Sequence, residues 1–262
     1  MFHDPPYRQL LTLIAARSQQ WLRNRIDDLP ALDDAGMQDM GEIALAAHIC
    51  TGFRGTPAPL QTFIQARLPT DFPVFSVPAW VGSMHGAAGI SRRSDPACDA
   101  FGRQEPAEPF KFDLPKAEEM LCSPIREDDI SEDIVDTYAR VLAACYRFGA
   151  ERPRFASART YGEAFSNCLR FADWAQQERR LMPLAQMCFC LCLIDPDHDV
   201  APMLADIITS QRPDGSFPHR IGFGSASQDG TALRPTLATL VALHTAVHRR
   251  WRNTKPPVPL AA

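Results

Sequence analysis

The heptapeptide Gln211-Arg212-Pro213-Asp214-Gly215-Ser216-Phe217 separates two segments near the end of the chain, 200–211 and 235–251, that repeat apolar residues at helical spacing. Its composition is typical of a tight turn, because glycine tolerates a positive φ and aspartate hydrogen-bonds the backbone that follows it. We therefore expect a helix, a turn and a helix here. Asp214 is expected to cap the next element and Phe217 to anchor the turn in the core.

The same helical periodicity extends over most of the chain, and short turns rich in glycine and proline separate its segments. This alternation predicts an all-α fold built from antiparallel helix pairs. The longest apolar run, 184–194, is interrupted by Gln186 and suits a buried helix. Beyond the two segments above, helices are expected over 10–26, 37–50, 57–69, 125–148, 160–177 and 182–194.

Residues 71–115 depart from this pattern, because prolines, glycines and small residues dominate and helical periodicity disappears. We expect a long loop with a short strand around 74–81. Loops of this length are either functional or disordered. The chain is thus divided into N-terminal helices at 1–70, a loop at 71–115 and a C-terminal helical region at 116–262 that forms one compact unit.

Composition places the 262-residue chain among ordinary globular proteins, with 45% hydrophobic and 22% charged residues. A net charge of −4 argues against nucleic acid as a partner, since such binders normally carry a basic excess. No apolar run approaches the roughly 20 residues of a membrane span, and the N terminus lacks the features of a signal peptide. Cytoplasmic location is expected, with the eight cysteines reduced and mostly packed in the core.

The segment 204–243 resembles the repeats of α/α toroids, the helical barrels of triterpene cyclases and protein prenyltransferases. Those repeats join an outer and an inner helix through a turn of the type Gln-x-x-Asp-Gly-Ser-(Trp/Phe), which 211–217 matches, and 235–243 is similar to their small-residue inner helix. The segment also resembles part of an uncharacterised bacterial helical family with a similar loop. Because full toroids need more helices than this chain supplies, the resemblance implies a partial α/α toroid or an open helical array.

An internal echo is compatible with such repeats. Arg67 precedes Phe72-Pro73 by the interval that separates Arg212 from Phe217-Pro218. Helical repeats bury their faces against neighbouring repeats, so an echo of this kind is expected in a stacked array. A chance match in a chain with 23 prolines explains it equally well.

Asp128, Asp129 and Glu132 fit the Asp-Asp-x-x-(Asp/Glu) pattern with which class I terpene synthases hold magnesium and diphosphate. Carboxylates spaced on one helical face are suited to Mg²⁺. The competing interpretation is structural, because acids at the start of a helix are favoured by the helix dipole.

His244 and His248 stand four residues apart on one predicted helix, a spacing that can hold Zn²⁺, and His219 is a candidate third ligand. The glutamate of a metalloprotease motif is missing between the two helical histidines. Two solvated or lightly buried histidines are the competing interpretation. In the 71–115 loop, His85 and Cys98 form a candidate nucleophile pair.

Two functions follow from these patterns. The first is a binding or accessory protein without a cofactor, whose concave face binds a partner protein, a peptide or an apolar small molecule. Its composition, rich in alanine, arginine and proline, is of a kind common in high-GC bacteria, where many such proteins act in specialised-metabolite or peptide-modification pathways; that context, and no particular residue, gives the expected pathway. The alternative is an enzyme of the terpene-cyclase or prenyl-transfer type that uses Mg²⁺ or Zn²⁺ on an apolar substrate. Candidate binding residues are Arg212, Asp214, Phe217 and His219.

Overall fold

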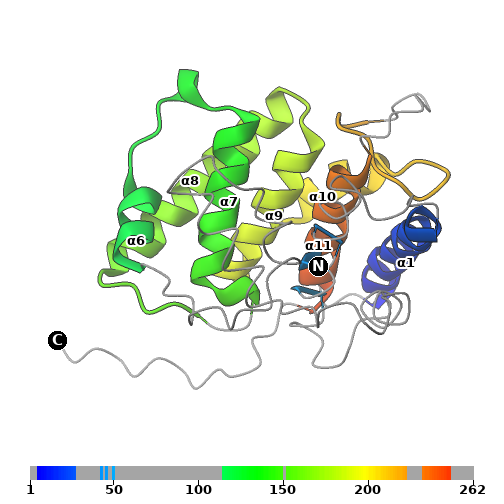
Figure 1. Ribbon diagram of the computed structural model, residues 1–262, viewed down its shortest axis with the longest axis horizontal. Helices are drawn as coiled ribbons and strands as arrows, with labels where there is room; N and C mark the ends of the chain where they lie inside the picture. Colours follow the sequence, from blue (N-terminus) through cyan, green and yellow to red (C-terminus); the bar gives the residue numbers. More distant parts are fainter. Residues whose placement is uncertain are drawn as a thin grey trace, which may run out of the picture.

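The computed structural model describes residues 5–27, 114–149, 152–222 and 232–248, together with six helical residues between 42 and 50. These residues form seven named α-helices and two short 3-10 helices, and no strand occurs among them (Figure 1). The all-α prediction is therefore confirmed for this part of the chain. The helices are α1 (Pro5–Asp27), α6 (Leu114–Cys122), α7 (Glu132–Cys145), α8 (Ala158–Gln177), α9 (Leu181–Ile194), α10 (Ala201–Thr209) and α11 (Leu233–His248); the 3-10 helices are η1 (Glu127–Asp129) and η2 (Arg147–Gly149).

Helix α9 occupies the centre of the described structure. Every one of its residues except Gln186 is buried, as expected for a helix that is apolar on all sides. Helices α7, α8, α10 and α11 all contact it, and α1 packs on the outer side of α11 (Figure 1). The prediction of a buried helix around 184–194 is confirmed.

Side chains of α1 and of the 211–217 loop tie the two segments together across almost the whole length of the sequence. Ser18 Oγ donates to the carbonyl of Gly215 over 3.0 Å, and Arg17 Nη2 donates to the carbonyl of Pro213 over 2.6 Å. In the opposite direction, Gln211 Nε2 donates to the α1 carbonyl of Ile14 over 2.9 Å. These contacts make the loop the docking site of the N-terminal helix.

The internal structure of the loop agrees with its composition. Gly215 has a φ of +95°, and Phe217 is fully buried, so the turn and its core anchor are confirmed. Asp214 Oδ1 accepts from Ser216 N at 2.9 Å and from Ser216 Oγ at 2.7 Å. The carboxylate of Asp214 thus closes the turn itself, and within the described residues both of its hydrogen bonds come from Ser216.

Helix α7 begins at Glu132, seven residues later than the periodicity suggested. The residues before it form η1 with extended residues on either side, Arg126 and Ile130. Ser131 then caps α7, with its hydroxyl accepting from Ile134 N at 3.4 Å. The apolar residues at 125 and 130 pack against the core without being helical, which explains the error.

Helix α6 was not anticipated, because the predicted loop ran to residue 115 and helices were expected to resume only after 124. Its sequence does carry signals: a proline in its first turn, which favours helix initiation, and the buried pair Ala117 and Leu121 one turn apart. The carbonyl of Leu121 accepts from Tyr138 Oη and from Asn167 Nδ2, each at 3.1 Å. These two buried bonds attach α6 to α7 and α8.

Several predictions fall on residues outside those described. They are the helix over 57–69, the strand around 74–81, all of the expected 71–115 loop before residue 114, and the first half of the internal echo. For 37–50, the six described residues are helical, in agreement with the prediction.

The cysteines behave as core residues wherever they are described. None of these seven forms a disulfide, and only Cys122 among them is not buried. Burial raises the pKa of the Cys145 thiol to about 12 and that of Cys190 well above its ordinary value. Such thiols stay protonated near neutral pH and are poor nucleophiles.

We predict that Gly215→Ala destabilises the protein by at least about 2 kcal/mol, because a side chain is strained at this positive φ. A Cβ built there would also lie 2.5 Å from the carbonyl oxygen of Arg17. The matched control is Gly162→Ala in α8, where no atom lies within 4 Å of the new methyl group. That change should be neutral or stabilise by about 0.5–1 kcal/mol. Urea unfolding measures both, and equal effects would contradict the docked turn.

We also predict that iodoacetamide at pH 8 labels Cys122 in the native protein and spares Cys145, Cys168 and Cys190. All three spared thiols are buried, which blocks access of the reagent. Burial also raises the pKa of Cys145 to about 12, so only about one in ten thousand of these thiols is ionised at pH 8. Peptide mass spectrometry gives the labelled positions, with urea-unfolded protein as the fully reactive control. Rapid labelling of Cys190 in folded protein would show that the α9 core opens.

Candidate functional site

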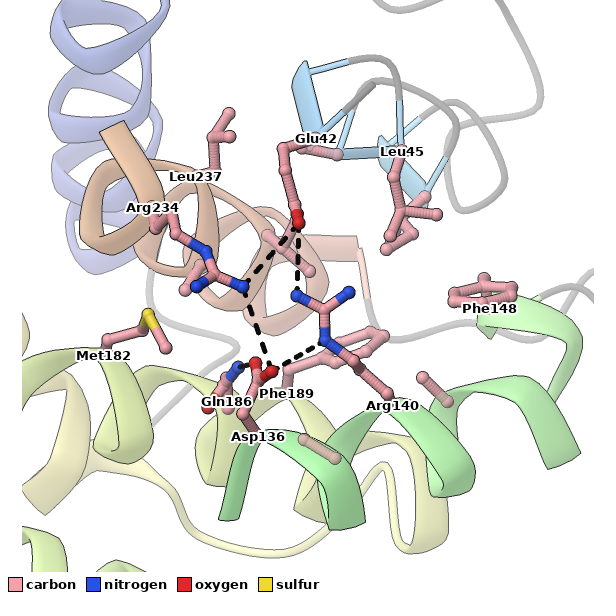
Figure 2. Close-up of a pocket in the computed structure, with 16 residues that line it drawn as sticks. Glu42, Leu45, Asp136, Arg140, Phe148, Met182, Gln186, Phe189, Arg234 and Leu237 are labelled. Carbon is pink, nitrogen blue, oxygen red and sulfur yellow. Dashed lines mark hydrogen bonds and ion pairs between the residues drawn. The ribbon is translucent and has the colours of Figure 1, made fainter. Parts of the chain in front are cut away.

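A cleft opens between α7, α9, α11 and the helical residues that begin at Glu42 (Figure 2). It has a volume of about 100 Å³, which suits a small group rather than a drug-sized ligand. Apolar side chains from these four segments and from η2 form most of its wall, among them Leu45, Ile49, Phe148 of η2, Met182, Phe189 and Leu237.

Two carboxylates and two guanidinium groups alternate in a ring at one side of the cleft. Figure 2 shows Glu42 and Asp136 facing each other, with Arg140 and Arg234 between them on opposite sides. The formal charges cancel, which reduces the cost of holding four ionised groups beside an apolar wall.

Arg140 is the tightly held member of this ring. Its Nε donates to Asp136 Oδ2 over 2.8 Å, and its Nη2 donates to Glu42 Oε1 over 3.2 Å. Burial lowers the pKa of Arg140, but the two carboxylates raise it by more, so the net shift is upward. Arg140 is therefore a permanent cation that joins α7 to the Glu42 segment.

Arg234 is held much more loosely. Its Nη2 lies 3.7 Å from Glu42 Oε1 and 3.9 Å from Asp136 Oδ2, both beyond hydrogen-bond range. Its side chain is 51% exposed, against 29% for Arg140. The ring thus has one fixed arginine and one at its rim whose hydrogen-bond donors no described residue uses.

Gln186 connects the ring to the central helix. Its Nε2 donates to Asp136 Oδ1 over 2.6 Å, while its buried Oε1 has no hydrogen-bond partner within the described part of the chain. The opposite amide assignment would place oxygen against carboxylate, so this orientation is the favourable one. The polar interruption at Gln186 was visible in the sequence, but its partner was not.

The ring is suited to recognition. Its acids accept hydrogen bonds from Arg140 and Gln186, and its guanidinium groups are poor proton donors because arginine stays charged in proteins. Among the lining residues that the structure describes, none is a serine, cysteine, histidine or lysine that would act as a nucleophile. The arrangement can orient a polar group while the apolar wall holds the rest of a ligand.

The acids predicted to hold Mg²⁺ lie apart from the cleft lining. Asp128 is 89% exposed in η1 and is 3.8 Å from the Arg126 guanidinium, and Asp129 belongs to the same short helix. Glu132 begins α7 and pairs with Arg180 at 2.9 Å. No group of three or more metal-ligating side chains is found among the described residues, so magnesium and zinc stay predictions.

The histidines are only partly brought together. The rings of His244 and His248 are 4.4 Å apart on α11, as their spacing predicted, and His244 is buried. His219 is exposed, and its carbonyl accepts from the first amide of α9, Leu181 N, at 2.9 Å. The candidate nucleophile pair, His85 and Cys98, lies outside the described residues.

The predicted binding residues serve the loop in which they stand. The backbone of Arg212 donates to the carbonyl of Ser216 and accepts from Gly215 N, Asp214 closes the turn, and Phe217 fills the core. None of these residues, nor His219, lines the cleft. Sequence reasoning missed the cleft because its charged residues come from three separate segments: the helical residues that begin at Glu42, α7 and α11.

No known protein family matches the chain, and comparisons with curated proteins and with solved structures give no match. The resemblance of 204–243 to toroid repeats stays a prediction. Among the described helices, none is long and apolar enough to cross a membrane.

We predict that Arg140→Met lowers the free energy of unfolding by about 2–3 kcal/mol, since it leaves two partly buried carboxylates with only a loose counter-charge. Arg234→Met should cost less than about 1 kcal/mol, because its long contacts are half exposed to solvent. Chemical denaturation of both variants tests this. A larger loss for Arg234→Met would show that the rim arginine is structural.

Proposed function

We propose that this chain is a helical binding protein whose cleft takes up an apolar group from a peptide, a partner protein or a small molecule. The supporting observation is a mostly apolar cleft whose charged residues are paired among themselves beside it. A ligand can therefore bury its apolar part without leaving the carboxylates of the ring unpaired. This proposal includes an accessory role in a bacterial specialised-metabolite or peptide-modification pathway.

For the architecture, we propose an open array of helix pairs, the second of the two forms that the toroid resemblance implies. The central position of α9 supports this choice, because a ring of helices around a hollow axis would leave no buried helix in the middle. In this arrangement the cleft lies where α7, α9 and α11 meet.

The size of the cleft limits what it can hold. A space of about 100 Å³ accommodates a short alkyl chain or one amino-acid side chain. Binding through one such group gives modest affinity by itself, which suits a protein that selects a tail or an end group of its ligand.

We predict that Ala238→Phe weakens binding of a short neutral alcohol, hexanol, by about tenfold or more, because the phenyl group would fill space in the cleft that a ligand must occupy. Ala238 lines the cleft from α11 and is half-buried. Saturation-transfer NMR on the full chain measures the binding.

The matched control is Ala158→Phe, which adds the same ring at an exposed position at the start of α8. Circular dichroism should show both variants folded, and hexanol should bind Ala158→Phe as it binds the unmodified protein. Equal hexanol binding by the two variants would refute the cleft as the binding site.

A further inference from the structure

Arg234 has donors that nothing in the described structure uses. A guanidinium group carries five N–H donors. Within the described residues, Arg234 pairs with two carboxylates, and both lie beyond hydrogen-bond range of its Nη2. Figure 2 shows Nη2 turned toward Glu42 and Asp136, with the other two nitrogens on the far side. The planar fork is thus oriented by the acids and available to a ligand.

The apolar part of the cleft continues from this arginine along α11. Arg234, Leu237, Ala238 and Val241 line the cleft at helical spacing, so they follow one face of the helix. Arg234 is the second residue of α11, at the end where the helix dipole favours negative charge. A ligand lying along this face would place its polar end at Arg234.

From this geometry we infer that the ligand of the cleft is an apolar chain that ends in a carboxylate, with Arg234 binding the carboxylate. This inference rests on the proposed function and names the ligand class for the same site. Carboxylate oxygens match the guanidinium fork in shape and spacing and form charge-assisted hydrogen bonds with it.

A cationic ligand fits the ring less well. Glu42 and Asp136 already accept from Arg140, and a cation that approached them would meet two guanidinium groups. A ligand carboxylate bound to Arg234 would be in direct contact with a positive charge. Glu42 and Asp136 lie farther away, on the other side of the Arg234 guanidinium, and Arg140 offsets part of their repulsion of the ligand. The alternation of charges therefore favours an anion at the rim.

Two sources supply this chemistry: a free short-chain acid and the C-terminal residue of a peptide. The first test compares hexanoate, hexanol and hexylamine by saturation-transfer NMR on the full chain. Hexanoate should bind about tenfold more tightly than the alcohol or the amine. In Arg234→Gln, hexanoate should bind about as weakly as hexanol, while hexanol binding is unchanged.

The matched control is Arg159→Gln, which removes an exposed arginine that also pairs with a carboxylate, Glu163. Hexanoate binding should be unaffected by that change. If hexanol binds as tightly as hexanoate, or hexylamine binds more tightly, the carboxylate inference is overturned while the cleft remains a binding site. If none of the three binds, the proposed function fails with it.

The second test identifies the source of the carboxylate. Acetyl-Ala-Leu and its C-terminal amide are compared with hexanoate on the same protein. If the peptide acid binds more tightly than hexanoate, and if this binding is lost in the peptide amide and in Arg234→Gln, the natural carboxylate is a peptide C terminus. If hexanoate binds more tightly than the peptide acid, and if this binding is lost in Arg234→Gln, the natural ligand is a free short-chain acid. Equal binding of the peptide and its amide, with hexanoate bound no better than hexanol, overturns the inference.

Discussion

The burial of α9 on every side is the constraint from which the rest of the described structure follows. An apolar helix without a polar face cannot lie at a surface, so α7, α8, α10 and α11 have to enclose it. One polar side chain, Gln186, interrupts the apolar surface of α9, and its amide needs a partner near the core. Gln186 finds Asp136 on α7, and that carboxylate in turn binds Arg140, which reaches Glu42. The charged ring thus begins at the one polar interruption of the central helix.

The second constraint is the fit between α1 and the 211–217 loop. An amphipathic helix at one end of the chain has to find its place against a helix at the other end, a contact with a high entropic cost. Apolar packing on α11 is not specific in register, whereas the bonds from Arg17, Ser18 and Gln211 are. Gly215 permits this close approach because it has no Cβ. In this chain the 211–217 loop, whose sequence resembles a toroid turn, binds α1 through these hydrogen bonds.

Much of the fold was predictable because helical periodicity is a local property of the sequence. The centre of α9, the span of α8 and the turn at Gly215 all follow from patterns within a few residues. The charged ring was not predictable in the same way. Asp136 and Arg140, four residues apart, look like an ordinary surface pair, and nothing local to Glu42 or Arg234 indicates that they meet. Only the packing of α7, α9 and α11 brings these side chains together.

The two arginines of the ring show why recognition explains Arg234 better than stability does. Arg140 already donates hydrogen bonds to both acids, so a second arginine at long range adds little folding free energy. Fixing the long Arg234 side chain also costs conformational entropy, and a weak contact does not offset that cost. Yet Arg234 lies beside an apolar stripe of α11, with its guanidinium oriented by the two acids and its donors unused within the described part of the chain. The guanidinium of Arg234 therefore gains most of its interaction energy when an anion binds to it and accepts its hydrogen bonds.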